Sequence, residues 1–245
     1  MDGIEEGGKV SCTGCGSEQH NYRECPDRWG PELARLDVMY QRDSGNTEIS
    51  REIYTAAKLL FRGMLREKEY PDRGIQALLT KFNDAGPRSA PTAAFSKTVA
   101  GRPQSGADGN RINRWLLEPG HKQYATECEA RLVGTRYIFQ ALSMTGAPSL
   151  PSGTIENSFH WLVGHKIKPG AYLDPVLLLP LNFNEMFNEP RTITSGHFVP
   201  LSRGTGLHNI RNTFLQSKKS NDLQSDNTLE ELLDMISGVL IRHSA

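Results

Sequence analysis

The sequence lacks three features that would assign it to a broad class. Lysine and arginine total 28 against 28 aspartates and glutamates, so neither sign of charge is in excess. No apolar run approaches the length of about 20 residues that a membrane span requires, and the acidic N-terminal segment has no signal-peptide core. We therefore expect a cytoplasmic protein without a membrane partner, in which any binding of a polyanion is local.

Cysteine is also scarce, and its placement is uneven. Three of the four cysteines belong to a stretch in which Cys12, Cys15, His20 and Cys25 have the spacing C-x2-C-x4-H-x4-C. Three thiolates and one imidazole complete a tetrahedral zinc site, and so short a loop folds because the metal replaces a hydrophobic core. The stretch resembles a zinc knuckle. We predict structural Zn²⁺ here, and a cluster of free thiols is the alternative.

The spacing indicates which metal this motif binds, but it leaves the function of the motif open. In the family that it resembles, knuckles bind single-stranded nucleic acid by stacking bases on exposed side chains. The resemblance implies nucleic-acid contacts from Tyr22 and Arg23, which lie between His20 and Cys25. A structural clip or a contact with another protein is an equal alternative.

A second pattern lies near the C-terminus, over residues 195–228. A short strand is expected to close on His197, and a turn rich in glycine covers residues 202–206. A return segment then carries Asn212, and a helix carries Asn221. The predicted order is strand, strand, helix.

This pattern resembles the HNH, or ββα-metal, nuclease family. His197 matches the family's general-base histidine, and residues 200–204 follow in register, with one extra residue in the loop. The resemblance makes Asn212 the residue that orients the histidine and Asn221 a metal ligand on the helix. The family's aspartate before the histidine, also a metal ligand, is replaced by Gly196.

The hydrolysis of a phosphodiester explains this combination of residues. A neutral histidine takes a proton from water near pH 7, and one divalent cation, Mg²⁺ or Mn²⁺, holds the phosphate and stabilises the leaving oxygen. Because Gly196 cannot coordinate, a carboxylate from elsewhere must join Asn221. We expect Glu189 or Asp174, which precede the first strand. The alternative for each polar residue is a capping or packing role.

Local charge agrees with phosphate binding. Residues 192–221 include four basic residues and no acidic one, and phosphate contact is the main source of affinity for nucleic acid. We expect Arg203 or Arg211 to clamp the phosphate, and Lys218 and Lys219 to contact DNA. A solvated basic face is the alternative.

Helical spacing of apolar residues predicts helices over Ser50–Glu69, Asp72–Phe82 and Tyr124–Met144. Residues 83–110 are rich in glycine, proline and serine, which predicts a flexible loop. A capping box at Thr228, with the sequence S/T-x-x-E, begins a last helix. We expect that helix to pack on the strand–strand–helix unit.

These patterns predict an α+β protein of three regions. They are a zinc knuckle at residues 1–30, a mostly helical region for DNA recognition or dimerisation at 31–170, and an HNH-like nuclease domain at 171–245. The resemblance implies a metal-dependent endonuclease for double-stranded DNA, of the sequence-specific type II restriction kind, acting as a homodimer. The alternative is a non-catalytic nucleic-acid-binding protein with a degenerate C-terminal scaffold.

Overall fold

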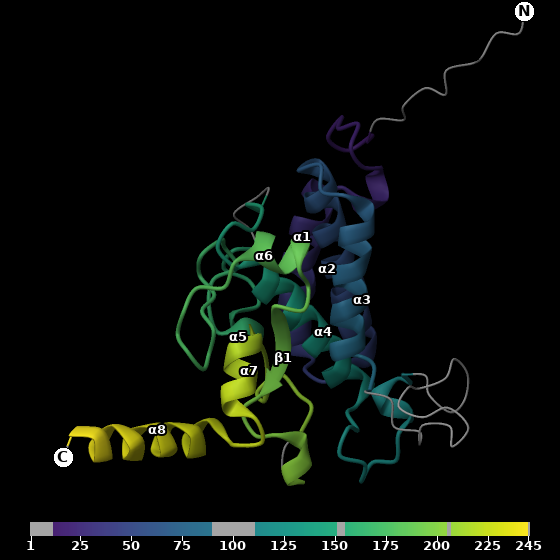
Figure 1. Ribbon diagram of the computed structural model, residues 1–245. Coiled ribbons are helices and arrows are strands. Elements are labelled where there is room, and N and C mark those ends of the chain that lie inside the picture. The colour runs from purple at the N-terminus through teal and green to yellow at the C-terminus, as the bar shows by residue number, and fades with distance from the viewer. Residues whose placement is uncertain (1–11, 90–110, 151–154, 205–206, 245) are drawn as a thin grey trace, which may run out of the picture.

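A computed structural model describes residues 12–89, 111–150, 155–204 and 207–244. Its body consists of helices, with one small sheet on its surface (Figure 1). The longer elements are α1 (Pro26–Arg42), α2 (Thr47–Glu67), α3 (Asp72–Ala85), α4 (Glu127–Leu142), β1 (Ile193–His197), β2 (Thr213–Ser217), α7 (Lys218–Gln224) and α8 (Leu229–Ser244). The shorter ones are η1 (Tyr22–Glu24), η2 (Arg114–Leu116), α5 (His160–Val163), α6 (Phe183–Asn188) and η3 (Leu201–Arg203). In the described ranges no helix is long and apolar enough to cross a membrane.

The helices and the small sheet together make an α+β protein. The helices begin at defined caps. The Asn46 side chain accepts from the backbone N–H of Ile49 at the start of α2, and Thr126 and Glu129 form a capping box at the start of α4. The three helices predicted from apolar spacing are present as α2, α3 and α4. The pattern did not predict α1. Pro26 stands at its first position, where the missing N–H is harmless.

Two of the predicted boundaries differ from the structure. The boundary at residue 30 falls inside α1, which starts at Pro26 directly after the last cysteine of the knuckle. The predicted loop at 83–110 begins too early, because α3 continues to Ala85, and residues 90–110 lie outside the described ranges. The metal loop therefore leads directly into the first helix of the body.

The sheet consists of β1 and β2, which pair antiparallel with Ile193 opposite Ser217 and His197 opposite Thr213. A two-stranded hairpin alone is marginally stable in water, and this one is fastened to the body. The Leu215 N–H donates to Gln140 Oε1 on α4 at 3.0 Å, and Tyr172 Oη donates to the Leu215 carbonyl at 2.6 Å. The hairpin is thereby held against the core through the middle of β2.

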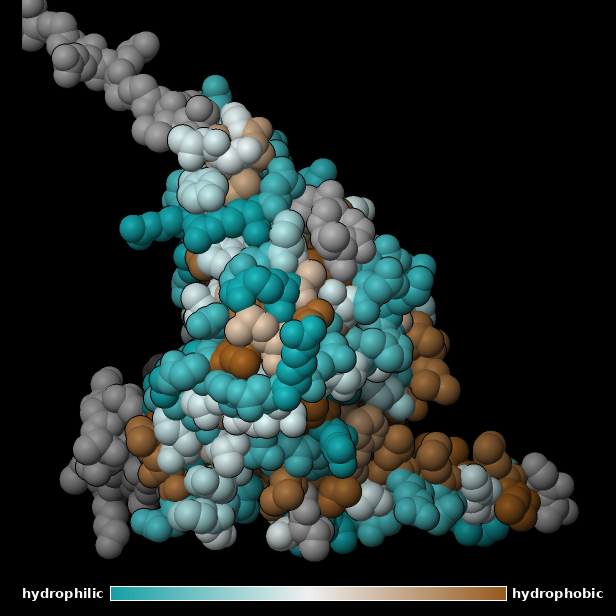
Figure 2. All heavy atoms as spheres, turned by 180° about the vertical axis from the view of Figure 1, so that it is seen from behind, coloured by the Kyte–Doolittle hydropathy of each residue, from teal (hydrophilic) through white to brown (hydrophobic). Residues whose placement is uncertain are grey.

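The last helix, α8, begins as predicted but does not pack as predicted. The Thr228 N–H donates to Glu231 Oε2 at 2.9 Å and the Glu231 N–H donates to Thr228 Oγ1 at 3.1 Å, which completes the capping box. Beyond its first turn the helix projects away from the body (Figure 1). Leu232 is buried, but Leu233 is 52% and Ile236 40% exposed. Apolar side chains gather along this projecting arm (Figure 2).

Candidate functional site

His197 is the last residue of β1, and a chain of hydrogen bonds fixes its ring. Its Nε2 lies 3.2 Å from His208 Nδ1, and His208 Nε2 lies 3.0 Å from the carbonyl oxygen of Gly86. A carbonyl only accepts, so His208 carries its proton on Nε2 and accepts at Nδ1. His197 must then donate through Nε2. Its remaining nitrogen, Nδ1, keeps a lone pair.

Both imidazoles are neutral at pH 7. Burial, with a smaller effect from the guanidinium of Arg114, lowers the pKa of His197 to about 4. Burial also holds the pKa of His208 well below its ordinary value. A neutral pair is what the hydrogen-bond chain requires, and it leaves His197 able to accept a proton at Nδ1.

We expect acidification from pH 7 to pH 5 to destabilise the folded protein. The pKa of His197 is about 4 when folded against an ordinary 6.5, so the unfolded chain binds more protons between these values. Stability is complete above the unfolded pKa and is lost as the pH falls toward the folded one. Each pH unit inside that window costs at most about 1.4 kcal/mol. Urea unfolding at both pH values tests this, with His197→Gln as the comparison. Equal losses in the parent and the variant would contradict it.

The structure gives the predicted role of Asn212 to His208. Asn212 Oδ1 accepts from the Val199 N–H at 2.8 Å, and its Nδ2 donates to the carbonyls of Val199 and Leu207 at 2.9 Å each. Asn212 therefore ties together the loop between the strands, and it is His208 that contacts the His197 ring. His208 was not predicted. A second histidine in that loop was the available signal.

Asp174, predicted as a metal ligand, serves a structural role instead. It is buried, its Oδ1 accepts from two backbone N–H groups, and its Oδ2 accepts from the Ser217 N–H and Ser220 Oγ. Burial acts to raise the pKa of Asp174, but the bonds from Ser220 and the backbone outweigh it and hold the pKa below its usual value. This carboxylate anchors the start of α7 and has no acceptor position left for a cation.

Glu189, the other predicted ligand, lies at the end of β1 opposite to His197. It is exposed just after α6 and precedes β1, whereas His197 closes that strand. Four residue steps of a strand span about 13 Å. Neither predicted carboxylate lines the cavity that Asn221 and His197 share.

His197 and Asn221 do lie on one cavity, of about 170 Å³. Two further amides, Gln216 and Gln224, line it together with Gly196, and none of its described lining residues is acidic. Gln224 Nε2 donates to the His197 carbonyl at 2.7 Å, which joins α7 to the end of β1. Three side-chain amides, those of Gln216, Asn221 and Gln224, therefore share this cavity with His197. These glutamines were not predicted.

A larger cavity of about 610 Å³ also reaches His197, and it is basic. Its charged lining residues are Lys81, Arg111, Arg114, Lys122 and one acid, Asp84. Arg114 donates to the carbonyl of Gly86, and although burial lowers its pKa to about 10, it remains charged at pH 7. The positive charge beside His197 comes from residues that precede His197 by 75 positions or more, so the local pattern could not reveal it.

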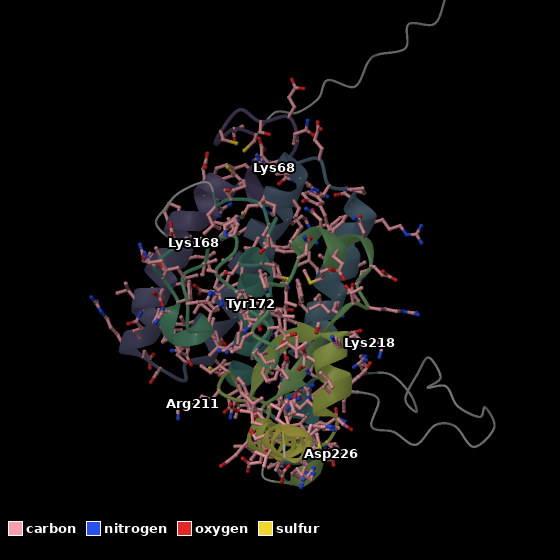
Figure 3. The ribbon with its side chains drawn as sticks, turned by 60° about the vertical axis from the view of Figure 1, so that its left-hand side comes forward. Lys68, Lys168, Tyr172, Arg211, Lys218 and Asp226 are labelled. Carbon is pink, nitrogen blue, oxygen red and sulfur yellow. The ribbon has the colours of Figure 1, made fainter. Side chains whose placement is uncertain are left out.

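The basic residues predicted from the motif itself lie elsewhere. Arg203 Nη2 lies 2.9 Å from Glu231 Oε2, and Lys218 Nζ lies 2.7 Å from Asp222 Oδ2. Arg211 and Lys219 are exposed and line neither cavity; Figure 3 shows Arg211 and Lys218 on different sides of the molecule. A phosphate clamp by Arg203 or Arg211 at His197 thus has no contact to support it.

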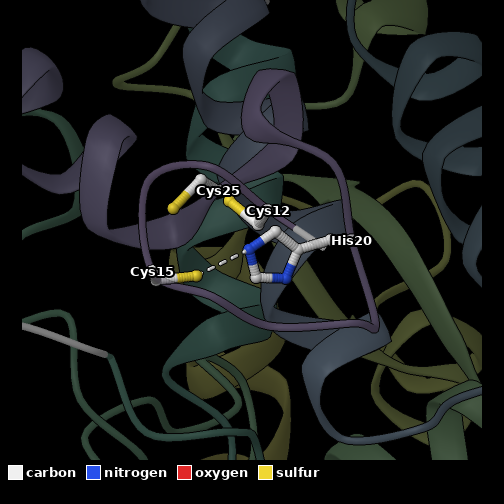
Figure 4. Close-up of side chains that lie close together, drawn as sticks. All are labelled: Cys12, Cys15, His20 and Cys25. Atoms are coloured by element: carbon white, nitrogen blue, oxygen red, sulfur yellow. Dashed lines mark hydrogen bonds between the residues drawn. The ribbon is translucent and has the colours of Figure 1, made fainter. Parts of the chain in front are cut away.

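The N-terminal motif forms a four-residue cluster (Figure 4). One ligand atom from each of Cys12, Cys15, His20 and Cys25 lies within 4.8 Å of the others. His20 Nδ1 is 3.0 Å from Glu67 Oε2, an arrangement that turns Nε2 toward the thiols. Burial acts to raise the pKa of Cys12, but backbone N–H groups outweigh it and lower the pKa to about 7. The donor set and its orientation fit zinc.

This cluster is docked on α2. A Cβ on Gly63 would lie 1.8 Å from the Glu24 carbonyl oxygen, so only glycine permits η1 to approach so closely. Glu24 forms ion pairs with Arg62 and Arg66. Tyr22 is 48% exposed, and the guanidinium of Arg28 lies 4.9 Å from its ring centroid. One face of the Tyr22 ring is therefore covered by Arg28.

Comparison with known proteins finds little similarity. No protein-family model matches the chain, and no curated protein matches it. A crystal structure of a type II restriction endonuclease is similar over 50% of this chain and 55% of that one, with 23% sequence identity and a TM-score of 0.41. The match thus covers about half of either chain. A likeness of this degree does not place the chain in a family.

Proposed function

We propose that the protein is a metal-dependent endonuclease that hydrolyses phosphodiester bonds in double-stranded DNA. The observation that carries the proposal is the chain from His197 through His208 to the Gly86 carbonyl. This chain supports a role for His197 as a neutral base, because its hydrogen bonds leave Nδ1 of that ring with a lone pair. That base stands where a basic cavity and an amide-lined cavity meet.

In this proposal His197 takes the proton of the attacking water at Nδ1. The resulting imidazolium keeps its hydrogen bond through Nε2 to His208. A bound Mg²⁺ or Mn²⁺ supplies charge neutralisation at the scissile phosphate and the leaving oxygen. Asn221 on α7, which lines the smaller cavity together with His197, is the proposed ligand.

The DNA backbone enters the basic cavity. Lys122 is exposed there and can reach a phosphate, whereas Arg111 is ion-paired with Asp84 and Arg114 is buried, so these two contribute charge from the cavity wall. Each phosphate neutralised by such a residue strengthens binding and makes it sensitive to salt. The helical body is proposed to read sequence, as in a type II restriction enzyme; that step is analogy with the motif's family.

The test of this function is incubation of the purified protein with plasmid and phage DNA in Mg²⁺ or Mn²⁺. Discrete fragments would support sequence-specific cleavage, and their ends would reveal the site. Absence of cutting with DNA still bound in a gel shift would favour a non-catalytic nucleic-acid-binding protein. One observation favours that second function: the smaller cavity contains no acidic residue among those described.

We propose that the homodimer forms through α8. Leu233, Ile236 and Val239 follow one another at spacings of three residues on one face of the helix, and each is at least 40% exposed. The first turn carries Glu230 and the last turn carries Arg242. Two copies paired antiparallel would bury the apolar faces and bring each acidic end beside a basic end.

We expect Ile236→Glu to convert the dimer into a monomer, because the new charge would be buried against the partner helix. Ile241→Glu is the matched control: Ile241 is 70% exposed and lies five residues further on, about 140° around the helix. Light scattering after size exclusion measures both masses. A monomeric parent, or two variants with the same mass as a dimeric parent, would contradict the α8 dimer.

A further inference from the structure

The basic cavity beside His197 contains positive charge that no acid neutralises. Lys81, on α3, lines it without an acidic partner in the described part of the chain, and burial lowers the pKa of its ammonium group. The acidic lining residue, Asp84, is already engaged: its carboxylate lies 3.2 Å from Arg88 Nη1 and 3.5 Å from Arg111 Nε. A partly buried charge without a partner is costly, so an anion beside Lys81 would bind favourably.

Lys81 also keeps hydrogen-bond donors for such an anion. Its Nζ donates to the Pro190 carbonyl at 2.7 Å. An ammonium group has three N–H donors and no acceptor, and the Lys81 side chain is partly exposed at the cavity. Two donors therefore remain for a ligand.

Lys81 and His197 lie toward opposite ends of β1. Lys81 is bonded to Pro190, which precedes the strand, whereas His197 is the last of its five residues. Four residue steps of a strand span about 13 Å. Ser195, which shares the face of His197 because the two are separated by one residue, also lines the cavity. The basic cavity therefore extends along β1, away from His197.

We propose that Lys81 binds a phosphate of the DNA backbone that lies a few nucleotides from the bond cleaved at His197. The inference rests on the proposed function for double-stranded DNA as the partner. One strand of a duplex carries a phosphate for about every 3.4 Å of helix axis, so the length of β1 matches about four nucleotides. Lys81 holds the strand in position and takes no part in the proton transfer.

The test is the salt dependence of duplex binding. Fluorescence anisotropy measures the affinity of the zinc-loaded full chain for a short labelled DNA duplex over a series of NaCl concentrations, without Mg²⁺ or Mn²⁺, so that cleavage does not intervene. Loss of one phosphate contact lowers the slope of log K against log[NaCl] by about 0.9. We expect that loss in Lys81→Met, with about tenfold weaker binding at low salt. Lys81→Arg keeps the charge and should keep the slope of the parent.

Lys58→Met is the matched control. Lys58, on α2, is also partly buried, and burial is the main cause that lowers its pKa. Its Nζ lies 4.5 Å from the centroid of the Tyr54 ring, and it lines neither the basic nor the smaller cavity. The variant removes the same charge elsewhere and should bind DNA with the affinity and slope of the parent.

The outcomes separate this contact from the nuclease. A slope that Lys81→Met leaves unchanged, or that Lys58→Met lowers equally, would overturn the inference even if the protein cuts DNA. If Lys81→Met fails to fold, Lys81→Gln keeps a donor for the Pro190 carbonyl and is held to the same criterion. A slope that falls in Lys81→Met of a protein that cuts no DNA would support the phosphate contact and remove only the proposed nuclease.

Discussion

His197→Ala is expected to lose cleavage of plasmid DNA by about a thousandfold, within the range of about 10² to 10⁴ that a general base contributes. The substitution removes His197 Nδ1, the nitrogen that the hydrogen bonds through His208 leave able to accept a proton. DNA affinity should change little, because the positive charge of the cleft comes from other residues. Nicking rates of supercoiled plasmid and gel-shift affinities measure the two effects separately.

Two further variants sharpen this result. His160→Ala removes an exposed histidine on α5 that lines neither cavity, and it should cut like the parent. His208→Leu leaves His197 in place but removes the acceptor of its Nε2 proton. It should cost about 10- to 100-fold, as loss of an orienting partner does elsewhere. Cleavage retained by His197→Ala would remove the assigned base, whatever the other variants do.

Cys15→Ser is expected to weaken zinc binding by at least about a hundredfold, because a hydroxyl does not replace a thiolate in a tetrahedral site. The parent should contain one zinc per chain. Loss of the metal should release residues 12–25 from α2, since a loop this short has no core of its own. Metal analysis after dialysis against a chelator, together with limited proteolysis, measures both effects.

Cys128→Ser is the matched control for that variant. Cys128 is buried on α4, where its Sγ lies 3.2 Å from Tyr40 Oη, and it is no part of the cluster. It should keep the zinc and the proteolysis pattern of the parent. Equal zinc content in the parent and in Cys15→Ser would contradict the zinc site. Figure 1 places the knuckle near the N-terminal end of the body, away from α7 and α8, so Cys15→Ser should preserve the catalytic cleft.

The sequence by itself determined the features that depend on neighbouring residues. Cys12 to Cys25 form a cluster because a short loop brings its own ligands together. The order of β1, β2 and α7, with His197 closing the first strand and Asn221 on the helix, followed from local spacing. The capping box at Thr228 is equally local, because its two partners are three residues apart.

Only the tertiary structure decided what surrounds His197. The Gly86 carbonyl and His208 are 122 residues apart in sequence, and no spacing rule connects them. The Gln216 side chain occupies its place across the strand pair because residue 196 is glycine, whose missing Cβ would lie 2.3 Å from Gln216 Nε2. The apolar stripe of α8 predicted that one face of this helix is buried, but it did not identify the surface that covers it. A periodic pattern indicates only that a face avoids water. The surface that covers the face depends on where the rest of the chain, or a second chain, lies.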